Sequence, residues 1–172
     1  PFSETDVVDN PISPYAFTKK SGELLTYNFH HLYNLDVINL RFFTVFGERQ
    51  RPDLAIHKFV RMIDEVQPIT LFGTGSTSRD YTYIADIVQG IEASINYLFA
   101  HQNVYEVINL GNNTPIQLSE MVAIIYEEMG KEPAITYLPM QAGDVERTFA
   151  SIKKAKALQG YQPTTSFQEG IR

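Results

Sequence analysis

The feature that most constrains the fold of this chain is the alternation of two hydrophobic patterns along it. Residues 36–43 and 104–110 are short runs rich in aliphatic and aromatic residues, as is typical of strands in a sheet. Residues 84–98 instead carry apolar side chains at every third or fourth position, as an amphipathic helix does. Strands that alternate with helices predict an α/β fold with a mostly parallel sheet.

The other segments continue this alternation. Ser13 is a suitable helix cap before Pro14, which fits a first helical turn, and Gly130 is placed to end a helix. In the first helix, Leu24, Leu25, Phe29 and Leu32 have the spacing of core residues. The expected helices span residues 14–34, 53–65, 84–98, 118–129 and 151–158, with a further turn after 166, and the expected strands span 36–43, 69–72, 81–84, 104–110 and 134–138.

Tyr15 and Lys19 form the most chemically suggestive pair, four residues apart in the first expected helix. Residues at this spacing share a helix face, so the phenol and the ammonium point the same way. A phenol with a pKa of about 10 is a poor base at neutral pH. A neighbouring ammonium favours the phenolate, which suits the phenol to general acid/base catalysis. The spacing alone also fits a surface ion pair beside a half-buried aromatic ring.

Composition excludes several kinds of site. The 172 residues include no cysteine, which excludes disulfides, thiolate metal ligands and thiol nucleophiles, and the four histidines lack metal-ligand spacing. A net charge of −6 provides no general attraction to nucleic acid or to an anionic membrane, and no apolar run reaches transmembrane length. We therefore expect a cytoplasmic protein that holds no metal and binds neither nucleic acid nor a membrane.

Further motifs surround the Tyr15–Lys19 pair in a fixed order. They are Ser13-Pro14-Tyr15-Ala16-Phe17-Thr18-Lys19, Leu40-Arg41-Phe42-Phe43-Thr44-Val45-Phe46-Gly47, Arg51-Pro52-Asp53, Ser78-Arg79-Asp80-Tyr81, Ile108-Asn109-Leu110-Gly111 and Gly143-Asp144-Val145. Together they resemble the extended short-chain dehydrogenase/reductases, and within them the NAD-dependent nucleotide-sugar epimerases. Thr44 and the Arg51-Pro52-Asp53 segment make the chain most similar to UDP-glucuronate epimerases.

The resemblance implies an architecture. Residues 1–46 would be the end of an NAD-binding Rossmann-like domain with a parallel sheet, containing the catalytic helix and the strand after it. Residues 47–172 would mainly form a small α/β domain that binds the sugar nucleotide, with 104–111 a strand that returns to the Rossmann sheet. The family's glycine-rich turn and a catalytic Ser/Thr would precede Pro1. Because the first residue is Pro and not Met, we expect a piece of a longer protein, whose full-length form would be a homodimer.

The resemblance also implies a reaction that leaves NAD unchanged overall. Tyr15 would remove a proton from a sugar hydroxyl while NAD takes the hydride from the same carbon, and Lys19 would bind the nicotinamide ribose. The resulting 4-keto sugar would turn its other face to the cofactor and receive the hydride back. Phe42 would lie in the segment that runs beside the nicotinamide ring. The remaining positions would bind the UDP-sugar: Thr44 at the sugar, Phe72 near the uracil, Arg51 and Arg79 at the diphosphate or ribose, Asp144 at the nucleotide, and Gln141 where related epimerases often have arginine.

Two other interpretations remain open. A nucleotide-sugar 4,6-dehydratase or decarboxylase would use the same tyrosine and lysine together with a further acid/base pair upstream. Alternatively, the chain as it stands is a catalytically silent module that binds a sugar nucleotide or forms dimers, because it lacks the glycine-rich turn that holds NAD.

Overall fold

The structure is a computed structural model that describes residues 1–139 and 146–172. Helices and strands alternate along most of the chain, as the sequence predicts. The helices are α1 (Pro14–Tyr33), α2 (Ala55–Asp64), α3 (Ile84–Ala100), α4 (Leu118–Met129), α5 (Lys153–Gln159) and α6 (Phe167–Ile171). The strands are β1 (Val37–Phe42), β2 (Thr44–Phe46), β3 (Ile69–Phe72), β4 (Ser78–Tyr83), β5 (Tyr105–Leu110), β6 (Pro115–Gln117), β7 (Ile135–Leu138) and β8 (Arg147–Thr148).

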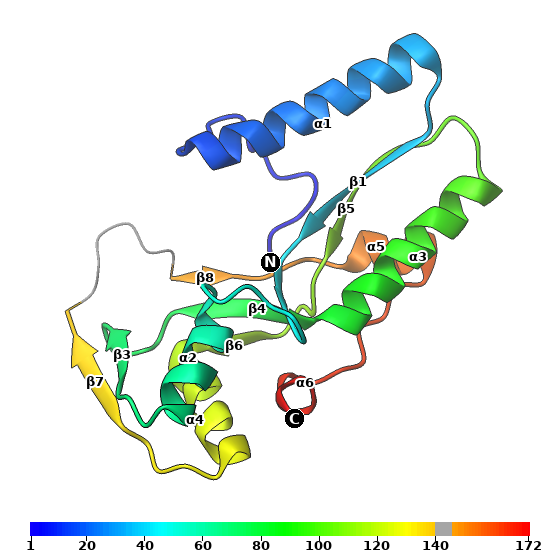
Figure 1. Cartoon of the computed structure of the whole chain (residues 1–172). Coiled ribbons are helices and arrows are strands. Elements are labelled where there is room, and N and C mark those ends of the chain that lie inside the picture. The colour runs from blue at the N-terminus through cyan, green and yellow to red at the C-terminus, as the bar shows by residue number, and fades with distance from the viewer. Residues whose placement is uncertain (140–145) are drawn as a thin grey trace.

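The strands β1 and β5 form a parallel pair between helices. Their register runs from Val37 opposite Tyr105 to Phe42 opposite Leu110. The helix α1 lies along one side of the pair, and α3 and α5 lie along the other (Figure 1). Parallel strands need a long crossover between them, and here the chain from β1 to β5 includes α3. The predicted α/β class is therefore confirmed.

The remaining strands form two groups, one around β4 and a separate pair of β3 with β7. The strand β4 is parallel to β2 and to β8 and antiparallel to β6, while β3 is parallel to β7. The sequence predicts none of β2, β6 and β8 as separate strands, because each has three residues or fewer. Such short segments become strands only through their partners, and those partners lie far away in the sequence.

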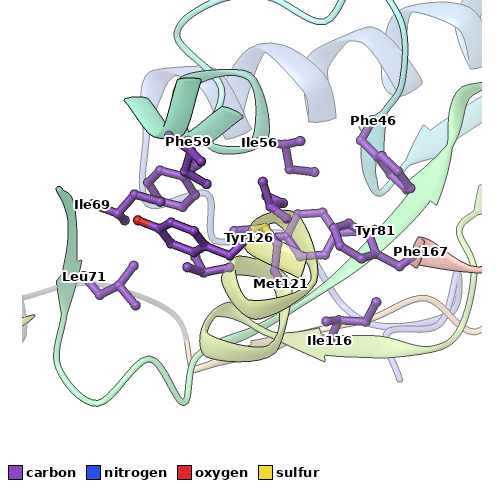
Figure 2. Close-up of a cluster of buried hydrophobic side chains, with 13 residues drawn as sticks. Phe46, Ile56, Phe59, Ile69, Leu71, Tyr81, Ile116, Met121, Tyr126 and Phe167 are labelled. Atoms are coloured by element: carbon purple, nitrogen blue, oxygen red, sulfur yellow. The ribbon is translucent and has the colours of Figure 1, made fainter. Parts of the chain in front are cut away.

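Two clusters of buried hydrophobic side chains hold these layers together. The larger cluster lies among α2, α4, α6 and the strands β2, β3, β4 and β6. Figure 2 shows it, including Phe46, Tyr81 and Phe167, and the Phe46 and Phe167 ring centroids are 4.9 Å apart. The smaller cluster lies between α3, α5 and the β1–β5 pair, and its members are Ile87, Ile108, Leu110, Ala155 and Tyr161. The predicted domain boundary after residue 46 stays a prediction.

The helix α1 has no buried residue. It begins as predicted, because Ser13 Oγ accepts a hydrogen bond from the Ala16 amide at 3.1 Å. The expectation of a core face was wrong for this chain: Leu24, Leu25 and Leu32 are all exposed, as is Phe29. Periodicity shows that a helix face is apolar, and it does not show what covers that face.

A buried carboxylate joins three parts of the chain around β4. Asp80 is fully buried and accepts backbone hydrogen bonds from Asn112 at 2.8 Å, Asn113 at 3.0 Å and Ala150 at 2.9 Å. Such donors satisfy a carboxylate that has left water. The Asp80 carboxylate thereby fixes β4 to the turn after β5 and to the segment that follows β8.

Candidate functional site

A cavity of about 710 Å³ lies where the first half of α1 meets the end of β1. The helix contributes Tyr15, Lys19 and Glu23 to its wall. The strand and the residue after it contribute Arg41, Phe42 and Phe43, and the segment before α1 closes another side. The cavity lining also includes Phe2, Ser3, Asp6, Val7, Val8, Asn10, Pro11, Ile12, Ala16, Lys20 and Asn109.

Tyr15 and Lys19 share one face of α1, as their spacing predicts. The Tyr15 side chain is 71% exposed, and Lys19 Nζ lies 5.3 Å from the centroid of its ring. The neighbouring Lys20 forms an ion pair with Asp9 at 3.3 Å. Among the described residues, no ion-pair partner is found for Lys19 and no hydrogen-bond partner for the Tyr15 hydroxyl. Both groups are therefore available to a ligand in the cavity, and the interpretation as a surface ion pair is not supported.

A charged pair that the sequence did not single out also lines this cavity. Arg41 on β1 donates two hydrogen bonds to Glu23 on α1, from Nε to Oε1 at 2.7 Å and from Nη2 to Oε2 at 2.8 Å. The hydrogen bonds from Arg41 hold the pKa of the Glu23 carboxyl below its ordinary value, and those to Glu23 raise the pKa of Arg41. A signal was present, because an arginine inside a largely apolar strand needs an acidic partner.

Phe42 and Thr44 continue the site along the strands. Phe42 is 51% exposed and lines the cavity, while Thr44, two residues later, is exposed at the start of β2. Thr44 is paired with Tyr81 on β4, so it shares a sheet face with Arg79, two residues before Tyr81. Arg79 Nη1 donates a hydrogen bond to the carbonyl of Ser78 at 2.9 Å. The structure therefore brings Thr44 and Arg79 to one face of this sheet, outside the cavity lining.

The other predicted site residues are not gathered into the cavity. Arg51 Nη2 lies 3.3 Å from Asp53 Oδ2, and both side chains are largely exposed. Phe72 is half-buried at the end of β3. Gln141 and Asp144 lie outside the described residues. The cavity thus joins Tyr15, Lys19 and Phe42, and the roles of all the predicted site residues stay predictions.

Over residues 1–139 and 146–172, no group of His, Asp and Glu side chains is arranged to hold a metal ion. No helix within those same ranges is long and apolar enough to cross a membrane.

The chain is similar in sequence to known proteins over its whole length. Residues 1–172 match the family model described as GDP-mannose 4,6 dehydratase. The UDP-glucuronate 4-epimerase of Thermodesulfobacterium geofontis is 44% identical over 173 residues, which cover 100% of this chain and 52% of that protein. The chain therefore spans about half the length of this relative.

Solved structures share the fold. The UDP-glucuronic acid 4-epimerase of Bacillus cereus, in complex with UDP-glucuronic acid and NAD, has a TM-score of 0.89 and 35% identity, covering 99% of this chain and 53% of that one. The UDP-glucose 4-epimerase of Thermotoga maritima, with UDP-glucose, also has a TM-score of 0.89, at 29% identity and with 99% and 54% covered. Since the two scores are equal, the fold does not distinguish between these two sugars.

Proposed function

The chain belongs to the GDP-mannose 4,6 dehydratase family, and we propose that it is the C-terminal part of an NAD-dependent UDP-sugar 4-epimerase. One observation carries the proposal: Tyr15 and Lys19 share a helix face that opens onto a cavity also lined by Phe42. Relatives and solved structures with epimerase names support the reaction class.

The residues at the cavity fit the nicotinamide end of NAD. Lys19 offers an ammonium for which no ion-pair partner is found among the described residues, and an ammonium can donate to both hydroxyls of a ribose. The exposed ring of Phe42 offers an apolar surface to a flat heterocycle. When bound, NAD supplies reversible hydride transfer at the sugar carbon that carries the reacting hydroxyl.

The proton steps fall to this chain's own residues. As the base, Tyr15 accepts the proton of the sugar C4 hydroxyl, and in the return direction it donates a proton to the 4-keto oxygen. Lys19, on the same helix face as Tyr15, would hold the nicotinamide ribose. Because the hydride leaves and returns on the same side of the site, inversion at C4 requires the 4-keto sugar to turn its other face between the two steps.

UDP-glucuronate is the substrate that we propose. Thr44 has an exposed hydroxyl that can hydrogen-bond a uronate carboxylate, and it lies on the same sheet face as Arg79. Arginine donates paired hydrogen bonds to phosphate oxygens, which suits Arg79 and Arg51 to the diphosphate. Phe72 would lie near the uracil, and Gln141 and Asp144 would complete the nucleotide site. The 44% identity to a UDP-glucuronate 4-epimerase supports this choice.

The proposal also covers the state of the whole protein. We infer a homodimer, which the exposed apolar side chains of α1, such as Leu24 and Leu25, would favour. The cytoplasm is the compartment that we propose, in keeping with a chain that has no cysteine.

Product analysis of the whole enzyme tests the reaction. The enzyme is incubated with UDP-glucuronate, and the products are separated and weighed by mass spectrometry. We expect a new UDP-sugar of unchanged mass that co-elutes with UDP-galacturonate. Turnover of other UDP-sugars alone would remove the proposed substrate. Loss of water or carbon dioxide would indicate a dehydratase or a decarboxylase instead, and UDP binding without any turnover would indicate a silent binding module.

A further inference from the structure

Polar contacts join α1 to the sheet beside an edge-to-face contact between the Tyr27 and Tyr105 rings, whose centroids are 5.1 Å apart. No residue of α1 is fully buried, so the polar contacts matter to its placement. Glu23 contacts Arg41 through two hydrogen bonds, and the Tyr105 hydroxyl donates to the Glu23 carbonyl at 2.7 Å. Farther along the helix, Thr26 Oγ1 lies 2.9 Å from Asn39 Oδ1. These contacts set how α1 is rotated about its own axis.

Of the side-chain contacts between α1 and β1, the Glu23–Arg41 pair is the nearest to Tyr15 and Lys19. Glu23 follows Lys19 by four residues and Tyr15 by eight, so the three share one helix face. At the rise of an α-helix, Glu23 is about 6 Å along the axis from Lys19. Arg41 immediately precedes Phe42 in β1. The pair therefore links the face that carries Tyr15 to the strand that carries Phe42.

The neighbour of Arg41 on β5, Asn109, makes further hydrogen bonds. Arg41 is paired across the sheet with Asn109, whose side-chain amide donates to the Phe2 carbonyl at 3.0 Å. The Asn109 backbone amide donates to Glu4 Oε1 at 2.9 Å, and the Glu4 charge also favours the Arg41 guanidinium. The strand pairing thus places Arg41 beside Asn109, which is itself bonded to the N-terminal segment, and the guanidinium donates paired hydrogen bonds to the Glu23 carboxylate.

We propose that the Glu23–Arg41 ion pair is a positioning device, which holds α1 at the rotation that points Tyr15 and Lys19 into the cavity beside Phe42. Neither Glu23 nor Arg41 would exchange a proton with the substrate. The inference takes the chemical roles of Tyr15 and Lys19 from the proposed function, while the geometric claim stands on the ion pair. Misplacing a catalytic group by about 1 Å can lower a rate about 100-fold without a comparable change in substrate binding.

The test compares variants of the whole enzyme in two measurements, steady-state kinetics and amide hydrogen exchange over residues 15–23. The variants are Glu23→Gln, Arg41→Lys, Glu23→Arg, Arg41→Glu and the swapped double variant E23R/R41E. The matched control is Glu106→Gln, which weakens the partly buried ion pair between Glu106 and Lys154, 2.6 Å apart, neither of which lines the cavity.

We expect Glu23→Gln and Arg41→Lys to lower kcat by about 10- to 100-fold, with KM and UDP affinity within about twofold. Amide exchange over residues 15–23 should accelerate in the same variants and not in the control. The swapped variant should regain kcat relative to both of its single charge reversals, which would show that the pair acts as a unit.

Two results would overturn the positioning role: an unchanged kcat with unchanged exchange in the single variants, or an equal loss of UDP affinity, which would indicate general destabilisation. Failure of the proposed function is distinguishable from these. In that case the unmodified enzyme turns over no UDP-sugar, while the exchange comparison still decides whether Glu23 and Arg41 fix α1.

Discussion

A phenol and an ammonium can act together on one substrate hydroxyl only when other protein groups leave them accessible. Tyr15 and Lys19 meet this condition in the described part of the chain. The Tyr15 ring is mostly exposed, and Lys19 Nζ is 5.3 Å from the ring centroid. At this scale the account depends on a single oxygen atom, the Tyr15 hydroxyl.

Replacing Tyr15 by Phe in the whole enzyme should remove the proton-transfer group and preserve the ring. We expect turnover to fall by about 10²- to 10⁴-fold, which is the usual contribution of a general acid/base, with UDP affinity retained. Tyr33→Phe is the matched control, since Tyr33 is an exposed tyrosine at the other end of α1. Steady-state kinetics and calorimetry check both variants, and near-normal turnover by Tyr15→Phe would refute the acid/base role.

Asp80→Asn tests the buried carboxylate that joins β4 to its neighbours. Three backbone amides donate to Asp80, and an asparagine offers one oxygen and would turn its own amide donors toward them. We expect the free energy of unfolding to fall by about 1–3 kcal/mol, measured by urea unfolding. Asp64→Asn, at an exposed position on α2, is the control and should change stability little. Equal stabilities of the two variants would contradict the assignment.

At the scale of elements, the helices α1 and α3 differ in how closely other side chains pack against their glycines. A Cβ built on Gly90 of α3 would lie 2.7 Å from Leu110 Cδ1 and 3.0 Å from Tyr161 Cε2. A Cβ on Gly22 of α1 would have no neighbour within 4 Å. The absence of a side chain thus lets α3 pack tightly on β5, while at Gly22 it only loosens the helix.

The two glycines give a matched pair of alanine substitutions. Gly22→Ala should stabilise the chain by up to about 1 kcal/mol, because alanine has the higher helix propensity. Gly90→Ala should destabilise it, since overpacking costs about 1–3 kcal/mol and exceeds the gain in propensity. Thermal and urea unfolding check both variants. A stabilising effect at Gly90 would show that α3 can move away from β5 at little cost.

Residue types near the ends of a helix predict where the helix begins and ends, but they do not predict which other segments pack against it. Ser13 caps α1 and Gly130, with φ of 60°, ends α4, as expected from residue type alone. Leu24 is exposed, and Arg79 is paired with Thr148 in β8. Both facts depend on segments of the chain that are distant in sequence. Local pattern carries no information about such partners.

The same limit applies to the site. A helical spacing of four predicts that Tyr15 and Lys19 share a face, whereas only the family resemblance implied that Phe42 would join them, and all three line the cavity. The Glu23–Arg41 contact spans 18 positions of the chain and could not be predicted by helical spacing. The placing of Arg51 and Phe72 at a nucleotide stays a prediction, because neither lines the cavity.

For the molecule as a whole, stability should depend on pH through Glu23. The Glu23 carboxyl has a pKa below its ordinary value of 4.5, because Arg41 donates hydrogen bonds to its charged form. Its stabilising contribution is therefore complete above about pH 4.5 and is lost as the pH falls through the lower, folded-state value. The difference in unfolding free energy between the unmodified chain and Glu23→Gln should shrink on acidification from pH 7 to about pH 3.

Urea unfolding of both chains at several pH values measures this difference. Other carboxylates with lowered pKa values, such as Glu128 and Glu169, are shared by the two chains and cancel in the comparison. A constant gap across the whole pH range would show that the charge of Glu23 does not stabilise the fold.

The most direct test of the central claim is a crystal structure of the whole enzyme with NAD and UDP-glucuronate bound. The account predicts the nicotinamide in the cavity between α1 and β1, Lys19 Nζ at the ribose hydroxyls, and the Tyr15 hydroxyl within hydrogen-bond distance of the sugar O4. A structure with the sugar and the nicotinamide bound elsewhere, and with Tyr15 in contact with neither, would contradict it.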